Sequence, residues 1–173
     1  MGRRPVIADV LAPGLTTVFC GSAVGAAAAK TGVPYSGPGN KFWPTLKLIG
    51  LVPPDFDPRG YLELPALGLG LTDLNKRESG ADHELSEEAD DPRGLRRKIL
   101  RYAPRIVAFT AKRPAKVFFA AEGWDGDLEY GLQPERLGPT LVVVLTSPSG
   151  RAGAFWDLAP WRALMELHRR EPR

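Results

Sequence analysis

The chain is poor in the residues that form disulfides and metal sites. Its 173 residues include one cysteine, Cys20, and two histidines, His83 and His168. A single cysteine excludes an intrachain disulfide, a four-cysteine iron–sulfur cluster and a cysteine-rich zinc site. Neither histidine has sequence neighbours that indicate a metal site or a proton relay, so both are expected at the surface. The sequence therefore predicts no metal and no organic cofactor.

The chain also lacks a long apolar segment and a strong charge imbalance. No apolar run approaches the roughly 20 residues that cross a bilayer, and no secretory signal pattern opens the sequence, so we expect a cytoplasmic protein. The net charge of +3 is compatible with a polyanionic partner but does not require one. Apolar and charged fractions of 43% and 25% are ordinary for a globular protein, and the length predicts one domain spanning residues 1–173.

Short apolar runs alternate with helical patterns along the chain. Buried parallel strands are predicted at 16–20, 106–110 and 141–146. Helices are predicted at 24–30, 41–51, 91–102, 113–121 and 160–170. The segment 55–70 has no clear pattern, and the polar segment 76–91 is expected to be an exposed loop or a short surface helix. This alternation indicates the α/β class, with a short, mainly parallel central sheet flanked by helices in a single three-layer domain.

Three loops stand where such a sheet binds ligands, beyond the carboxyl ends of its strands. One follows Cys20, one surrounds Asp73 and one follows Thr146. The first loop has a glycine at each end, which allows its backbone to approach a flat ligand closely. The sequence therefore predicts a binding site at this edge of the sheet.

Five short motifs follow one another along the chain. They are Gly21-Ser22-Ala23-Val24-Gly25, Thr31-Gly32-Val33-Pro34-Tyr35, Asn40-Lys41-Phe42-Trp43, Gly70-Leu71-Thr72-Asp73-Leu74 and Ser147-Pro148-Ser149-Gly150. Their order is similar to that of the mismatch-specific uracil/thymine-DNA glycosylases. Each motif alone is weak, but the ordered set resembles this family from about Ile7 to the C-terminal helix. The resemblance implies a uracil-DNA glycosylase-like fold and an enzyme that flips a base out of a mispair and hydrolyses its N-glycosidic bond.

The resemblance also implies a pocket for the flipped base. The backbone of Ser22 and Ala23 would contact the polar edge of a pyrimidine, and the Tyr35 ring would stack on its face. Tyr35 is alternatively a core residue, and Asn40 would either bond the base or brace the loop. The full set of implied pocket residues is Gly21, Ser22, Ala23, Gly25, Tyr35 and Asn40.

The first motif departs from the family pattern at Ala23. Family members usually carry an asparagine here that helps to place the attacking water, which a methyl group cannot do. We expect Asp73 to take over, because a carboxylate can stabilise positive charge on the sugar and accept a proton from water. Alternatively, Asp73 caps a turn or pairs with Lys76 or Arg77. The protein would then be a weakly active or inactive DNA-binding member of the same fold.

The late motif resembles the family's wedge loop, which fills the gap left by the flipped base. Its residues are Ser147, Pro148, Ser149, Gly150 and Arg151. Arg151 stands where an apolar side chain is common, and an arginine can stack or donate to guanine or phosphate; the motif is alternatively only a turn. The expected partner is double-stranded DNA with a G·U mispair, or with a G·T mispair or a damaged pyrimidine, bound by a monomer. No lysine position suggests a Schiff base, so we expect a monofunctional glycosylase.

Overall fold

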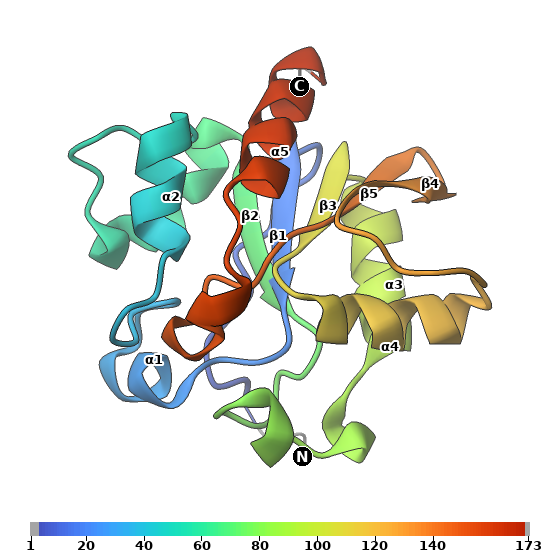
Figure 1. The fold of residues 1–173 in the computed structure, drawn as a ribbon, viewed down its shortest axis with the longest axis horizontal. Helices are drawn as coiled ribbons and strands as arrows, with labels where there is room; N and C mark the ends of the chain where they lie inside the picture. Colours follow the sequence, from blue (N-terminus) through green and yellow to red (C-terminus); the bar gives the residue numbers. More distant parts are fainter. Residues whose placement is uncertain (1–3, 172–173) are drawn as a thin grey trace.

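The central sheet has five strands, of which four are parallel. The computed structural model describes residues 4–171. The parallel strands are β1 (Thr17–Gly21), β2 (Leu69–Asp73), β3 (Ile106–Phe109) and β5 (Thr140–Val144), and β4 (Gly131–Leu137) pairs antiparallel with β5 at one edge. The spatial order is β2-β1-β3-β5-β4 (Figure 1). Because β1 has β2 on one side and β3 on the other, its carboxyl end lies where the chain changes direction across the sheet, a preferred place for ligands.

Helices cover both faces of this sheet. They are α1 (Ala26–Thr31), α2 (Phe42–Ile49), α3 (Pro92–Tyr102), α4 (Lys112–Glu122) and α5 (Ala159–Arg170), with 3₁₀ segments η1 (Pro58–Leu67), η2 (Asp82–Glu84), η3 (Glu87–Ala89) and η4 (Gly150–Phe155). One core cluster joins the sheet to α2, η1 and α5, and a second joins it to α3 and α4. Figure 1 shows α2 on the left, α5 in front of the strands at the upper centre, and α3 and α4 on the right, with α1 at the lower left and η4 just below the centre. The predicted three-layer α/β domain is confirmed.

Alternate strand residues supply the two cores. Phe19 of β1 faces α2 and α5, where its ring lies 5.1 Å from that of Phe42 and 6.1 Å from that of Trp161. Its neighbour Cys20 belongs to the cluster on the opposite face. Burial of each large side chain contributes about 1.5–3 kcal/mol. The Trp161 indole nitrogen also donates to the carbonyl oxygen of Thr146 at 3.1 Å, which ties α5 to the loop after β5.

The predicted helices and strands are present, with ends that differ by no more than two residues. Two strands were not predicted. Gly70 interrupts the apolar pattern that would indicate β2. The structure requires glycine there, because a Cβ would lie 2.6 Å from the carbonyl oxygen of Val10. The edge strand β4 alternates exposed and buried residues and contains Pro134, which lowers its strand signal. Within residues 4–171, no helix has the length and apolarity needed to cross a membrane.

Candidate active site

A cavity of about 820 Å³ opens beyond the carboxyl ends of the parallel strands. Gly21 and Asp73 are the last residues of β1 and β2, Thr110 directly follows β3, and Ser147 lies shortly after β5. All four residues line the cavity. This volume lies in the range of pockets that enclose a small ligand. The structure places every predicted site residue at its wall: Gly21, Ser22, Ala23, Gly25, Tyr35, Asn40, Asp73, Ser147, Pro148, Ser149, Gly150 and Arg151. Their individual roles stay predictions.

Gly21 lies at the point where polar side chains converge. A Cβ built on it would be 2.8 Å from Asp73 Oδ1, 3.2 Å from the Tyr35 hydroxyl and 3.5 Å from Thr110 Oγ1. The loop is held in place because its carbonyl groups accept from the segment after β2: Leu74 N donates to Gly21 O at 2.9 Å. A side chain here would crowd Asp73 Oδ1 and the Tyr35 hydroxyl, so this position requires glycine.

The adjacent Ser22 carries a polar atom with no partner. Its hydroxyl oxygen is buried, and no hydrogen-bonding group among residues 4–171 reaches it. Its carbonyl oxygen, by contrast, accepts from Asn75 N at 2.8 Å. Buried hydroxyls without partners are uncommon in folded proteins, and each costs about 1–3 kcal/mol. This one lies in the loop that was predicted to contact the base.

Tyr35 packs one face of its ring against the protein. The ring stacks on Phe42 with centroids 3.8 Å apart and planes 14° apart, and its hydroxyl lies 3.4 Å from Thr110 Oγ1. Burial, and then the charge of Asp73, raises the pKa of the Tyr35 hydroxyl, which therefore stays neutral. Asn40 braces this region, because its Oδ1 accepts from Phe42 N at 2.9 Å. Bracing was one of the two roles predicted for Asn40.

Asp73 is the last residue of β2, and its side chain is 16% exposed. Burial raises the pKa of Asp73; the ammonium group of Lys76, 3.4 Å from Asp73 Oδ2, opposes this shift, and the net pKa lies above its ordinary value. The alternative pairing with Lys76 is therefore present in the structure. A carboxylate with a raised pKa is better matched to proton transfer near neutral pH.

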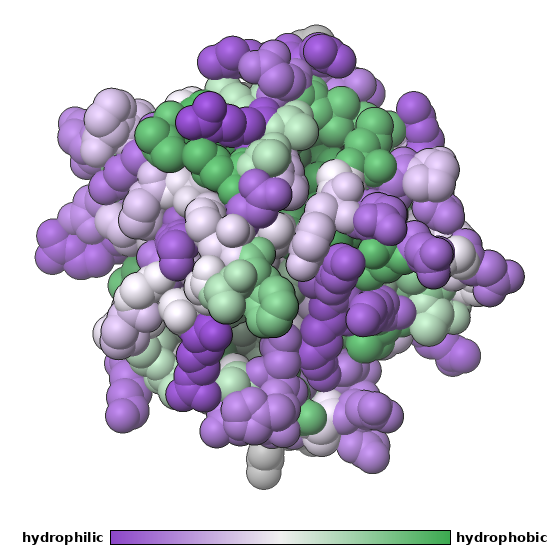
Figure 2. Space-filling view, viewed as in Figure 1, coloured by the Kyte–Doolittle hydropathy of each residue, from purple (hydrophilic) through white to green (hydrophobic). Residues whose placement is uncertain are grey.

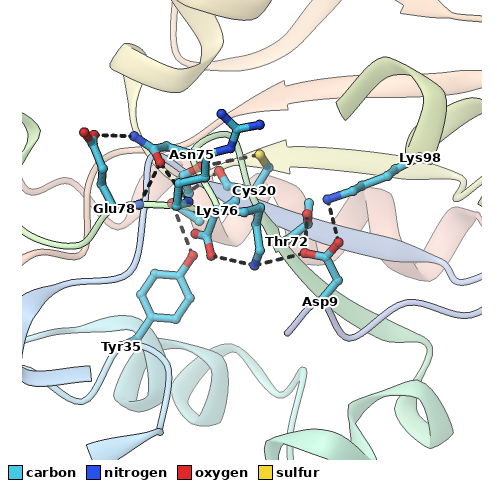
Figure 3. A network of polar contacts seen from close by, with 12 residues as sticks. Asp9, Cys20, Tyr35, Thr72, Asn75, Lys76, Glu78 and Lys98 are labelled. Atoms are coloured by element: carbon cyan, nitrogen blue, oxygen red, sulfur yellow. Dashed lines mark hydrogen bonds and ion pairs between the residues drawn. The ribbon is translucent and has the colours of Figure 1, made fainter. Parts of the chain in front are cut away.

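The contact with Lys76 belongs to a longer chain of alternating charges (Figure 3). Lys76 Nζ also lies 3.0 Å from Asp9 Oδ1, and Lys98 Nζ lies 2.6 Å from Asp9 Oδ2. Thr72 Oγ1 donates to Asp9 at 2.7 Å. Burial acts to raise the pKa of Asp9, but the two lysines and Thr72 outweigh it and hold that pKa low. For Lys76, burial acts to lower the pKa, but Asp73 and Asp9 outweigh it and raise that pKa.

The late loop packs against the segment before α2. Lys41 N donates to Pro148 O at 2.8 Å, and a Cβ on Gly150 would overlap the carbonyl oxygen of Pro38. Ser149 Oγ accepts from Arg151 N at 3.3 Å, and Arg151 is exposed. The loop is thus a fixed turn at the cavity wall with an arginine facing outward. Its predicted use as a wedge in DNA stays a prediction.

Comparison with known proteins agrees with this geometry. The model of the uracil DNA glycosylase superfamily matches residues 8–163, which include every cavity loop. The chain belongs to this superfamily. The solution NMR structure of a proposed uracil DNA glycosylase from Methanosarcina acetivorans has a similar fold, with a TM-score of 0.62 and 22% sequence identity. That similarity covers 96% of this chain and 98% of the other. The family prediction is confirmed at the superfamily level, which supports DNA glycosylase activity.

Two further features around the cavity of this superfamily member were not predicted from sequence. Asp9 reaches the site because Val10 and Leu71 exchange two backbone hydrogen bonds of 2.9 Å, which add the N-terminal segment to the edge of β2. No motif surrounds Asp9, so no local signal indicates this. Lys98 contacts the site only through Asp9, whereas Lys76 also pairs directly with Asp73.

The other feature is the acidic segment 76–91. It was expected to be exposed, and much of it is, but it also forms a wall of the cavity. Gly80 N donates to Val24 O at 3.0 Å, which joins the segment to the first loop. His83 is exposed, as predicted, yet it stands at the cavity mouth with Asp82 and Glu84. Among residues 4–171, no group of three or more histidine, cysteine, aspartate or glutamate side chains is arranged to hold a metal.

Proposed function

We propose that the protein is a monofunctional DNA glycosylase that flips uracil out of G·U mispairs and hydrolyses its N-glycosidic bond in base-excision repair. The observation that carries this proposal is the Asp73 carboxylate, which has a raised pKa and lies in the cavity beside Gly21 and Tyr35. Superfamily membership supports the coarser statement of DNA glycosylase activity.

The flipped base would enter the cavity between Tyr35 and the first loop. One face of the Tyr35 ring packs on Phe42, so the base would stack against a ring that is already fixed in place. The backbone of Ser22 and Ala23 would contact the polar edge of the base, with Asn40 bracing the wall. A fixed aromatic surface and backbone polar groups are what an extruded base requires.

Asp73 would act on water and on the sugar. As the N-glycosidic bond breaks, uracil leaves with the bonding electrons and positive charge develops on the sugar, which the carboxylate stabilises. A water oxygen then bonds to C1′ and its proton passes to Asp73. General-base assistance of this kind contributes typically ~10²–10⁴-fold. This assignment explains how the chain could work with Ala23 in place of the family's asparagine.

Lys76 supports the monofunctional assignment. It is the one lysine among the described residues that line the cavity. Its ammonium group lies between the carboxylates of Asp73 and Asp9, which raise its pKa. A Schiff base needs a neutral amine, so Lys76 is unsuited to the covalent step that precedes strand cleavage.

Single-turnover release of uracil from a G·U duplex tests the proposal. We expect Asp73→Asn to lower the rate by about a hundredfold or more, the lower end for loss of a general base. The matched control Asp125→Asn removes an exposed carboxylate outside the cavity and should leave the rate unchanged. A fully active, folded Asp73→Asn protein would contradict the role of Asp73. Duplexes with A·U and G·T pairs would test the mispair preference.

A second candidate is a weakly active or inactive DNA-binding member of the fold. Ala23 at the cavity wall favours it, because its methyl group cannot orient water. If the wild-type protein releases no uracil but binds duplex DNA with an affinity that falls steeply with salt, this candidate is correct. The monomeric state, the cytoplasmic location and the domain span 1–173 stay predictions.

A further inference from the structure

The aromatic ring of Phe155 stands in solvent beside the cavity. Phe155 is 78% exposed, more than any other large hydrophobic residue in the described part of the chain. It ends η4, the turn whose first residues, Gly150, Arg151 and Ala152, line the cavity. Single exposed hydrophobic residues are common, so the location of Phe155 matters more than its exposure.

Phe155 is exposed although the turn that carries it is anchored at both ends. At its start, Ala152 N donates to Ser149 O at 3.0 Å. At its end, the next residue, Trp156, packs against the core residue Trp161 with ring centroids 5.8 Å apart. Lys41 Nζ lies 5.7 Å from the centroid of the Trp156 ring. The backbone thus holds Phe155 outward on a supported turn.

The turn that carries Phe155 begins at the cavity wall and is kinked at Ala152, where the backbone leaves helical geometry. Four residues of chain span at most roughly 14 Å, so Phe155 stays near the mouth of the cavity that Arg151 lines. A base that flips into the cavity leaves its two former stacking neighbours exposed beside that mouth. In Figure 2, a small apolar group lies just below the centre of this face, where Figure 1 shows η4, with hydrophilic side chains around it.

The charges around the mouth favour DNA on the side of η4. Arg151 is exposed on this turn, and Lys41 lies behind it. Asp157 lies two residues after Phe155, but its Oδ1 accepts from Ala159 N at the start of α5. The opposite wall carries Asp82 and Glu84, which repel phosphate. A duplex whose target base enters the cavity would therefore rest on the η4 side.

We propose that Phe155 is a DNA-contacting residue that stacks on the bases exposed when the target nucleotide leaves the helix. The proposal rests on the proposed function, since it requires a flipped nucleotide in the cavity. An aromatic face stacks on any base, and apolar side chains commonly enter unstacked base steps. Arg151 would contact phosphate or the widowed base, while Phe155 supplies the apolar surface.

Binding to a duplex with a tetrahydrofuran abasic-site analogue opposite guanine tests this proposal. We expect Phe155→Ala to weaken binding by about 5- to 150-fold, the range for one aromatic–base stack. Phe155→Trp keeps a stacking ring and should stay within about threefold of wild type. The control Leu48→Ala removes a side chain that is 66% exposed on α2 and should have no effect. Thermal unfolding would check that all three variants are folded.

The outcomes separate this inference from the proposed function. Wild-type affinity retained by Phe155→Ala would overturn the inference, as would an equal loss in Leu48→Ala or a wild-type protein that does not bind this duplex. Uracil release is measured separately. If the wild-type protein releases no uracil but Phe155→Ala still weakens duplex binding, the glycosylase proposal fails while the DNA contact stands.

Discussion

At the scale of single residues, Gly21 is required because of the atoms around its α-carbon. The ideal Cβ position is 2.8 Å from Asp73 Oδ1 and 3.2 Å from the Tyr35 hydroxyl, so a methyl group would displace two proposed functional groups. Gly25 lies four residues further along the same loop, and no heavy atom lies within 4 Å of the ideal Cβ position of Gly25. One loop thus contains a constrained glycine and an unconstrained one.

This contrast gives a matched pair of variants. We expect Gly21→Ala to slow single-turnover uracil release by about tenfold or more, because the carboxylate of Asp73 must move from its place beside Tyr35. Gly25→Ala should slow uracil release less than Gly21→Ala, since its backbone conformation is open to alanine and no heavy atom of the protein lies within 4 Å of the added methyl group. Circular dichroism and thermal unfolding would show whether each variant is folded. Equal rates for the two variants would contradict the proposed placement of Asp73.

At the scale of secondary-structure elements, the edge of β2 sets the charge state of the site. The N-terminal segment pairs with Leu71 and brings Asp9 beside Lys76, while Lys98 reaches Asp9 from α3. Lys76 lowers the pKa of Asp73, and Asp9 raises it. The charged groups that act on Asp73 are therefore Lys76, Asp9 and Lys98, and the neutral side chains of Tyr35 and Cys20 lie close by.

Two neutralising substitutions should shift the pH profile in opposite directions. The proposed base is ionised Asp73, so activity is lost as the pH falls through its pKa. Lys76→Met removes a positive neighbour and should move the acid limb of single-turnover excision to higher pH. Asp9→Asn removes a negative neighbour of Asp73, so that Lys76 pairs with Asp73 alone. This variant should move the acid limb to lower pH.

A pH–rate profile of each folded variant checks this prediction. The plateau rate of each profile serves as a control for the position of the Asp73 carboxylate. A purely structural defect would lower this plateau rate without moving the acid limb. Shifts in the same direction, or unmoved limbs in both variants, would show that Asp73 does not control the acid limb.

At the scale of the whole molecule, charge is unevenly placed around the cavity mouth. The acidic segment 76–91 is held there by backbone bonds to the first loop and by an ion pair of 2.9 Å between Asp90 and Arg113 of α4. Arg151 lies on another part of the cavity lining, on η4. The net charge of +3 thus conceals a mouth where one segment is acidic and η4 carries an exposed arginine.

Neutralising the acidic wall should tighten binding to DNA. We expect Asp82→Asn combined with Glu84→Gln to strengthen binding to undamaged duplex a few-fold at low salt, because two exposed negative charges at the cavity mouth no longer repel phosphate. The gain should fade at high salt, where exposed charges are screened. Asp125→Asn with Asp127→Asn removes the same charge away from the cavity lining and serves as the control. Filter binding at several salt concentrations measures the DNA affinity of both double variants. Equal gains in affinity would show that net charge alone, and not the position of the charges, controls binding.

The sequence by itself determined the α/β order, the position of most helices and strands, and the loops that line the cavity. These follow from local causes: apolar periodicity, proline and glycine at the ends of elements, and short motifs such as those around Gly21 and Asp73. Tertiary structure alone decided the rest. Asp9 meets Lys76, the acidic segment becomes a cavity wall, and Phe155 stays in solvent beside the mouth. Each of these features depends on contacts between segments that are far apart in the chain. Those contacts are stabilised by burial and by charge pairing, which no local sequence pattern predicts.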